Sequence, residues 1–277
     1  KVSSQSRLLG KADRSYAYLP MTHIFGLGTV LMASIYARSG LLMRSQFEAV
    51  DVFEALARHG MTQLQGPPAM FSRLLAWLDT QGIEHPVAPD LRYVYTGAAP
   101  LDLSVKNAVQ ARFGLPLHHG YGLSEYAGAL TLCRLGEWRD DVSAGYLVEG
   151  AELRIVSSEG RDLPYGETGE IYMRGLGLMP GYFRDQAITE QVMKPGGWYA
   201  SGDLGRQSAD GALQVVGRLK EMIIRSGFNV YPGEVEAVLL NYPGVQKAAV
   251  IGRKTADGNE EILAFVEPKF GIEIDAS

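Results

Sequence analysis

Short apolar runs alternate with longer amphipathic stretches over the first half of the chain. The short runs are rich in apolar and aromatic residues and are bounded by Gly, Pro or charged residues, which predicts strands. The longer stretches repeat apolar residues three and four positions apart, which predicts helices. The predicted strands are 15–20, 40–43, 62–64, 90–96 and 116–118, and the predicted helices are 27–38, 51–59, 67–78 and 103–113. This alternation predicts parallel strands joined by crossover helices.

The pattern changes after about residue 141. Glycine becomes frequent and the predicted strands are short, which indicates a small β-rich, barrel-like unit with strands at 152–156, 169–174 and 212–216. A last stretch has predicted strands at 222–225, 246–251 and 261–266 and a helix at 232–240. We therefore predict an α/β fold in three parts: an αβ subdomain of a large N-terminal domain (1–140), a barrel-like subdomain (141–217) and the start of a small, incomplete α+β C-terminal domain (218–277).

Composition narrows the classes of function. The 277 residues are 46% hydrophobic and carry a net charge of −5, which allows a sizeable core and argues against general binding to nucleic acid or an anionic membrane. The single cysteine, Cys133, excludes an internal disulfide and a cysteine-based metal cluster. No apolar run approaches the ~20 residues of a transmembrane span, and no signal-peptide pattern opens the chain, so we predict a cytoplasmic location.

Three stretches whose residues could bind or react with a ligand follow predicted strands, at 20–26, 97–101 and 120–125. In parallel sheets of this kind, ligands bind at the carboxyl ends of the strands. These three stretches are therefore the first candidates for a binding site.

The stretch at 121–125 combines groups that a nucleotide and its metal need. Tyr121 offers a flat apolar face for a base, and Gly122 lets the backbone approach a ligand closely. The Ser124 hydroxyl can donate to a phosphate oxygen, and the Glu125 carboxylate is a hard oxygen ligand for Mg²⁺. The alternative interpretation is a helix N-cap, in which Ser124 satisfies only backbone N–H groups.

A second candidate lies at 199–204, where an acid follows a glycine beside an aromatic residue. The Asp203 carboxylate can accept hydrogen bonds from both hydroxyls of a ribose. Arg218 adds a cation able to reach a phosphate or ribose. The alternatives are an ordinary Asx turn for Asp203 and a solvated surface side chain for Arg218.

Taken in order, these stretches resemble motifs of the adenylate-forming superfamily: acyl-CoA synthetases, 4-coumarate-CoA-ligase-like enzymes, firefly luciferase and the adenylation domains of peptide synthetases. The matches are Pro-x-x-His-x-x-Gly at 20–26, the adenine-side turn at 97–101, Tyr-Gly-x-Thr-Glu at 121–125, Tyr-x-Thr-Gly-Asp-Leu at 199–204, and the hinge with the first part of the small domain from 217. Ser124 and Ser201 stand where Thr is commoner, and both keep the hydroxyl. The resemblance covers nearly the whole chain and is nearest to the acyl-CoA and 4-coumarate-CoA-ligase-like enzymes.

The resemblance implies a two-step reaction. A carboxylate attacks the α-phosphate of ATP to give an acyl-adenylate and pyrophosphate, and a thiol, usually that of coenzyme A, then displaces AMP to give a thioester. ATP, Mg²⁺ and coenzyme A are the implied cofactors and co-substrates, and a small carboxylic acid is the implied substrate. A homodimer is one option for the assembly.

The resemblance also implies roles for individual residues. Glu125, Ser124 and His23 would serve catalysis, with Glu125 on Mg²⁺ and Ser124 on the α-phosphate. Lys220 would be the hinge of the small domain, and Gly227 with Phe228 would lie near coenzyme A. The residues that would contact the nucleotide are Gly97, Ala98, Ala99, Tyr121, Gly122, Ser124, Asp203 and Arg218. The residues that would line the acyl pocket are His23, Phe25, Gly26, Gly97, Gly120 and Gly122.

Two motifs of that superfamily have no match here. Its glycine-rich phosphate loop should precede His23, but residues 1–20 lack the glycines that let backbone amides surround phosphate. Its catalytic lysine should lie in a Pro-Lys-x-x-x-Gly-Lys context near the carboxyl end, and residues 268–271 have the wrong spacing. We therefore expect the chain to be a fragment of a longer enzyme that cannot catalyse adenylation by itself.

The type of acid is constrained by charge. An amino-acid-activating relative needs an acidic side chain near His23 to hold the substrate ammonium, and residues 19–31 contain none. An uncharged, apolar or aromatic acid is therefore favoured. Two alternatives stay open: a peptide-synthetase-type or luciferase-like adenylating enzyme, and a non-catalytic nucleotide-binding relative.

Overall fold

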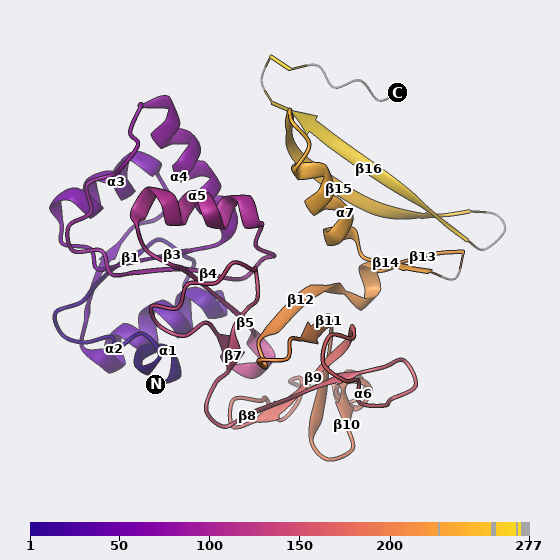
Figure 1. Cartoon of the computed structure of the whole chain (residues 1–277). Helices are drawn as coiled ribbons and strands as arrows, with labels where there is room; N and C mark the ends of the chain where they lie inside the picture. The colour runs from indigo at the N-terminus through magenta and orange to yellow at the C-terminus, as the bar shows by residue number, and fades with distance from the viewer. Residues whose placement is uncertain (227, 256–258, 270, 273–277) are drawn as a thin grey trace.

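A computed structural model describes residues 1–226, 228–255, 259–269 and 271–272 of the chain. The N-terminal half forms a seven-stranded sheet with the order β2-β1-β3-β4-β5-β6-β7 (Figure 1). Its strands are β1 (Arg14–Ala17), β2 (Gly40–Met43), β3 (Gln63–Gly66), β4 (Tyr93–Thr96), β5 (Leu117–Leu123), β6 (Gly128–Leu132) and β7 (Tyr146–Leu147). β1 to β5 pair in parallel, whereas β6 and β7 run antiparallel to their neighbours.

Helices cover both faces of this sheet, as crossover connections between parallel strands require (Figure 1). One face carries α3 (Ala49–Arg58), α4 (Pro68–Thr80) and α5 (Leu103–Phe113), and the other carries α1 (Val2–Gln5), the π-helix η1 (Phe25–Met32) and α2 (Ala33–Ala37). The first layer buries Leu56, Phe71 and Val94 in one cluster. The second layer buries Phe25 with Tyr95 in another, which places aromatic side chains near the carboxyl end of β4.

A second, antiparallel sheet follows. It has the order β10-β11-β9-β8, with β12 also paired to β11. The elements are β8 (Ala151–Val156), β9 (Gly169–Gly175), α6 (Gln186–Val192), β10 (Met193–Lys194), β11 (Trp198–Gln207) and β12 (Leu213–Arg218). Its core also contains Tyr126 and Leu130, which come from the end of the first sheet, so the two sheets share one apolar cluster.

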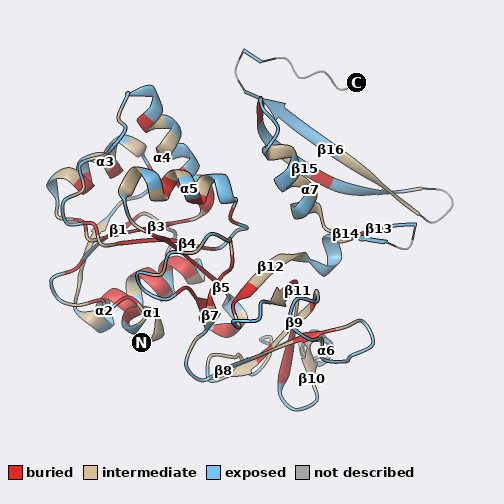
Figure 2. Ribbon diagram, viewed as in Figure 1, coloured by how far each residue is buried: buried red, intermediate tan, exposed pale blue. Residues whose placement is uncertain are grey.

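The remaining elements form a small and largely exposed α+β part (Figure 2). They are η3 (Leu219–Glu221), β13 (Ile223–Arg225), β14 (Phe228–Val230), α7 (Pro232–Leu240), β15 (Val245–Lys254) and β16 (Glu260–Pro268). The strands pair as two antiparallel hairpins, β13 with β14 and β15 with β16. Within the described ranges no helix is both long and apolar enough to cross a bilayer.

The predicted α/β fold class is confirmed, and most predicted elements match observed ones to within a few residues. The division at 140 and 217 stays a prediction. The expected helix at 27–38 differs from the observed one, because the helix begins at Phe25 and its first eight residues are π-helical. A side chain at Gly26 would meet the Pro20 carbonyl oxygen at 2.3 Å, so glycine allows this tight entry. π turns are frequent at functional sites.

Candidate functional site

The end of β5 is the centre of the candidate site. The predicted strand at 116–118 continues through residues 121–123, which pair antiparallel with β6. The predicted strand was too short because β6 supplies a partner that a local pattern does not reveal. The pairing has a bulge at Gly122, where a side chain would lie 2.1 Å from the Gly128 carbonyl oxygen, so glycine is required for the two backbones to meet.

Glu125 is held on both its backbone and its side chain. It lies in the short 3₁₀-helix η2 (Ser124–Tyr126), directly after β5. The Tyr182 hydroxyl donates to Glu125 Oε1 at 2.9 Å, and the Met179 N–H donates to the Glu125 carbonyl at 2.8 Å. The loop after β9 therefore fixes the orientation of this carboxylate.

Leu123 is the N-cap of η2 and Ser124 is its first helical residue, so the N-cap interpretation of Ser124 is wrong. The residue is exposed, and its hydroxyl is open to a ligand. Its contact with an α-phosphate stays a prediction.

Asp203 lies in the middle of β11 rather than in an Asx turn. It pairs in register with Arg218 at the end of β12. The Tyr121 hydroxyl donates to Asp203 Oδ2 at 2.5 Å, and Arg218 Nε lies 3.1 Å from Asp203 Oδ1. Arg218 thus has an ion-pair partner, although its side chain is 57% exposed, so the interpretation as a merely solvated cation is also wrong.

Burial dominates the electrostatics of Asp203. The loss of solvation raises the pKa of this carboxyl, although Tyr121 and Arg218 both act to lower it. The charge of Glu125 adds a further upward shift to the pKa of Asp203. The two carboxylates are therefore close enough to repel each other across the same region.

Tyr199 lies on the same strand as Asp203 and connects that strand to Glu125 through Tyr182. It is 3% exposed, and its hydroxyl lies 3.1 Å from the Tyr182 hydroxyl. Burial raises the pKa of Tyr199, and the charges of Glu125 and Asp203 both contribute to that rise. Glu125 and Asp203 are 78 positions apart in the sequence (203 − 125), and the structure brings them to one side of the junction between the two sheets.

A pocket lies beside the end of β5, where Gly120 and Gly122 contribute to its lining. Its empty volume, including the part open to solvent, is about 340 Å³. The residues that line it are His23, Ile24, Phe25, Thr29, Tyr95, Ala98, Gly120, Gly122, Gly128 and Ala129. Tyr121 stands between two of the lining glycines while its hydroxyl reaches Asp203, so one strand end serves both the pocket and the carboxylate.

Four of the six residues predicted for an acyl pocket line this pocket, namely His23, Phe25, Gly120 and Gly122. Gly26 and Gly97 do not line it. Gly26 packs on the Pro20 carbonyl, and Gly97 is buried between β4 and β5.

The other predicted site residues lie around this region. Ala98 lines the pocket with a positive φ of 68°, and Ala99 beside it is exposed. Lys220 lies in η3, which joins the second sheet to the small α+β part, and is exposed. Phe228 lies in β14 and is 74% exposed, whereas Gly227 is outside the described residues.

No metal-binding cluster is present in the described part of the chain, where no three His, Cys, Asp or Glu side chains come together. A Mg²⁺ ion bound with a nucleotide needs only one or two protein carboxylates, because phosphate oxygens and waters complete its shell. Glu125, with one oxygen free of the Tyr182 hydrogen bond, fits that requirement.

Sequence reasoning missed Tyr182 and Tyr95. No predicted motif includes Tyr182, and its pairing with Glu125 depends on a loop that returns from the second sheet. Tyr95 precedes the predicted adenine-side turn, and no sequence signal shows that its ring turns into the pocket. Both contacts arise from tertiary packing.

Comparison with known proteins identifies the family of the chain. A family model described as AMP-binding enzyme matches residues 2–183. The sulfoacetate–CoA ligase of Cupriavidus necator is 33% identical over 264 residues, which cover 95% of this chain and 51% of that protein. The 4-coumarate–CoA ligase of Vanilla planifolia is 35% identical over 262 residues, which cover 92% of this chain and 47% of that protein.

A solved structure, that of ATP-bound MatB from Rhodopseudomonas palustris, matches with a TM-score of 0.91 at 28% identity. The match covers 98% of this chain and 53% of that one. The chain thus spans about half the length of the relatives that it matches. With the motifs, the fold and the family model in agreement, the chain belongs to the AMP-binding enzymes of the adenylate-forming superfamily.

Proposed function

We propose that this chain is part of an ATP-dependent acid–thiol ligase, an AMP-forming acyl-CoA synthetase. The enzyme would join a carboxylic acid to AMP and then transfer the acyl group to the thiol of coenzyme A. The observation that carries the proposal is that hydrogen bonds through Tyr182 and Tyr199 tie Glu125 to β11, the strand of Asp203, beside a pocket lined by His23 and Phe25. The similar proteins described above include CoA ligases.

Asp203 is the proposed ribose ligand. Its two oxygens already bind Tyr121 and Arg218, so its orientation is fixed before a nucleotide arrives. A carboxylate held in this way can accept hydrogen bonds from two vicinal hydroxyls without a further cost in side-chain entropy. Tyr121 and the backbone at 97–99 are the proposed adenine contacts.

Glu125 and Ser124 are the proposed contacts to the metal and the α-phosphate. Mg²⁺, when bound, would neutralise charge that develops on the phosphate oxygens. Glu125 would hold that ion through the oxygen that Tyr182 leaves free. Ser124 would donate its hydroxyl to a phosphate oxygen, and His23 at the pocket mouth would orient the acid carboxylate.

The pocket is the proposed acyl site. Its lining includes Phe25, Tyr95 and Ala129 and contains no Asp, Glu, Lys or Arg among the described residues. An uncharged, apolar or aromatic acid suits such a lining, because a buried charge without a partner is costly.

The small α+β part is the proposed mobile element. Lys220 lies in the only connection that the described residues make between β12 and β13, so a rotation there would carry the hairpins and α7 as a unit. Phe228, exposed on β14, and Gly227 are the proposed neighbours of the coenzyme A thiol in the second half-reaction. We also propose a cytoplasmic location, where ATP and coenzyme A are available, and leave a homodimer as an option.

The test uses the product of the gene's full reading frame with ATP, Mg²⁺ and a panel of carboxylic acids. We expect AMP release that depends on both an acid and coenzyme A, and its loss in Asp203→Ala and Glu125→Gln variants. AMP release that does not depend on a thiol would favour a peptide-synthetase-type or luciferase-like enzyme. If AMP fails to raise the melting temperature, a non-catalytic relative is favoured.

The 277-residue chain alone is proposed to be inactive, since its first 20 residues contain no glycine-rich phosphate loop and its end contains no matching lysine motif. Pyrophosphate release by this chain with ATP and a carboxylic acid would contradict that proposal.

A further inference from the structure

We propose that Tyr95 is a specificity-determining residue of the pocket and that it selects carboxylic acids whose body carries a neutral oxygen atom, such as a hydroxyl, ether or keto group, over the matching hydrocarbon acids. The inference rests on the proposed function, because it requires the pocket to receive the acyl group.

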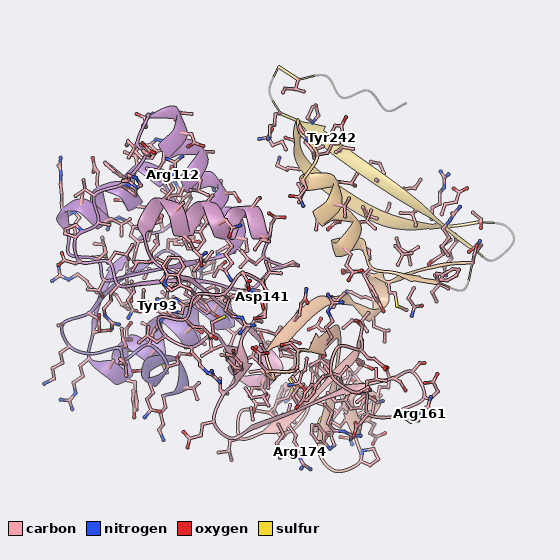
Figure 3. All side chains as sticks on the ribbon, in the orientation of Figure 1. Tyr93, Arg112, Asp141, Arg161, Arg174 and Tyr242 are labelled. Atoms are coloured by element: carbon pink, nitrogen blue, oxygen red, sulfur yellow. The ribbon has the colours of Figure 1, made fainter. Side chains whose placement is uncertain are left out.

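The Tyr95 ring is held in place by its aromatic neighbours. Tyr95 lies near the carboxyl end of β4 and is only 6% exposed, yet it lines the pocket. Its ring meets Phe25 edge-on, with centroids 5.5 Å apart and planes at 89°, and stacks on Tyr93 at 6.0 Å. Tyr93 can be found in Figure 3 within the first sheet. A ring fixed on two sides presents its hydroxyl in one direction.

The Tyr95 hydroxyl occupies the space that two glycines leave. A methyl group at Gly120 would come within 2.5 Å of the Tyr95 hydroxyl oxygen, and one at Gly97 within 3.1 Å. Both glycines were predicted to line the acyl pocket, and in the structure the absence of their side chains leaves room for the Tyr95 phenol. Tyr95 therefore bounds the pocket at this point and sets how far an acid can enter.

The Tyr95 hydroxyl has no hydrogen-bond partner among the residues that the structure describes, in contrast to Tyr121 and Tyr182, whose hydroxyls each bind a carboxylate. Burial raises the pKa of Tyr95, so its phenol stays neutral and can donate. The Tyr95 hydroxyl faces the pocket and would lose its water when an acid fills the pocket, so an oxygen on the bound acid would satisfy a donor that is otherwise left unpaired.

The acceptor is expected to be neutral. The pocket lining contains no charged side chain in the described ranges apart from the titratable His23 at its mouth, and its other hydroxyl belongs to Thr29. A second carboxylate would lose its hydration there without gaining a cation. A hydroxyl, ether or keto oxygen on an otherwise apolar or aromatic acid can accept the Tyr95 hydrogen bond and brings no second charge into the pocket.

The experiment measures AMP release by the full reading-frame product with acid pairs that differ by one oxygen: cinnamate with 4-hydroxycinnamate, benzoate with hydroxybenzoates, and hexanoate with hydroxy- and ketohexanoates. For the acid pair with the largest difference, we expect the kcat/KM of the wild type to be at least about tenfold higher with the oxygenated acid than with its hydrocarbon partner. Tyr95→Phe keeps the ring and removes the hydroxyl, so it should reduce that ratio at least fivefold, mainly through the oxygenated acid.

Tyr93→Phe is the matched control, because Tyr93 is buried beside Tyr95 but does not line the pocket. It should leave the ratio unchanged, and Tyr95→Leu provides a second variant without the hydroxyl if Tyr95→Phe is unstable. A wild type without a preference in any pair, or a Tyr95→Phe variant that keeps the wild-type ratio, overturns the inference. A wild type that releases no AMP with any acid overturns the proposed function instead, and this inference with it.

Discussion

The Tyr182 hydroxyl donates a 2.9 Å hydrogen bond to the Glu125 carboxylate, although Glu125 follows β5 of the first sheet and Tyr182 lies in the loop after β9 of the second. The loop of Tyr182 is tied to its own helix, because the Tyr182 N–H donates to the Thr189 hydroxyl at 2.9 Å. The carboxylate proposed to hold Mg²⁺ is therefore oriented by the second sheet. This arrangement explains why a local motif alone does not complete the site.

Tyr182→Phe is expected to weaken the proposed Mg²⁺–nucleotide site without unfolding the protein. A hydrogen bond to a charged group contributes about 1.5–3 kcal/mol, so we expect the Mg²⁺ concentration needed for half of the ATP-induced rise in Tm to increase about tenfold. The measurement is a Mg²⁺ titration of that rise in Tm. Tyr165→Phe, at a residue 65% exposed, is the control. An unchanged Mg²⁺ midpoint in Tyr182→Phe would show that the hydrogen bond has no such role.

Asp203→Asn is expected to separate stability from binding. Because burial raises the pKa of Asp203 in the folded protein, the ionised form is disfavoured by folding at neutral pH. The amide removes that charge and still accepts the Tyr121 hydrogen bond. We expect a higher Tm for the ligand-free variant at pH 7, together with loss of the Tm increase that AMP produces in the wild type.

The pH dependence of this effect has a definite sign. A carboxyl with a raised pKa binds its proton more readily in the folded state, so its contribution favours folding at low pH and is lost as the pH rises through the raised pKa. The Tm advantage of Asp203→Asn over the wild type should therefore shrink as the pH falls below the raised pKa of Asp203. An advantage that stays constant from pH 7 to pH 4 would contradict the burial argument.

Gly122→Ala is expected to destabilise the end of β5. A methyl group there would lie 2.1 Å from the Gly128 carbonyl oxygen, so one of the two strands must move. Overpacking of this kind costs about 1–3 kcal/mol. Urea unfolding should show the loss, and Gly217→Ala, where a methyl group meets no atom within 4 Å, should be close to neutral. Equal stabilities for the two variants would mean that the bulge adapts freely.

Arg139 is expected to hold the two sheets together. Its guanidinium binds Asp141 near the first sheet and Asp210 in the turn between β11 and β12, and its side chain is only 12% exposed. Arg139→Met should lower the Tm at pH 7 by about 2–6 °C. Arg161→Met, at an exposed ion pair, should leave the Tm almost unchanged; Asp141 and Arg161 are labelled in Figure 3.

Arg139 also lowers the pKa of Asp141 from 3.8 to about 2. A lowered carboxyl pKa gives stability that is present above the ordinary pKa and is lost as the pH falls toward the lowered one. The Tm difference between the wild type and Arg139→Met should therefore narrow from pH 4 to pH 2. A difference that widens over this range would assign the effect to another group.

The sequence predicted the parallel half of the fold well, because each strand there is a compact apolar run next to a helix with a clear period. It predicted less of residues 120–147, where β6 and β7 form only through pairing with β5. Asp203 and Glu125 were predicted as site residues from their motifs, and their roles stay predictions. Tyr95 and Tyr182 were not, because their positions depend on contacts between segments that are distant along the chain.

Arg218 completes the ion pair with Asp203 and is also the last residue of β12 before η3. If the small α+β part turns about Lys220, two positions later, the movement begins next to the guanidinium that pairs with Asp203, the carboxylate proposed to bind the ribose. Departure of the nucleotide and reorientation of the hairpins would then be mechanically linked through one side chain.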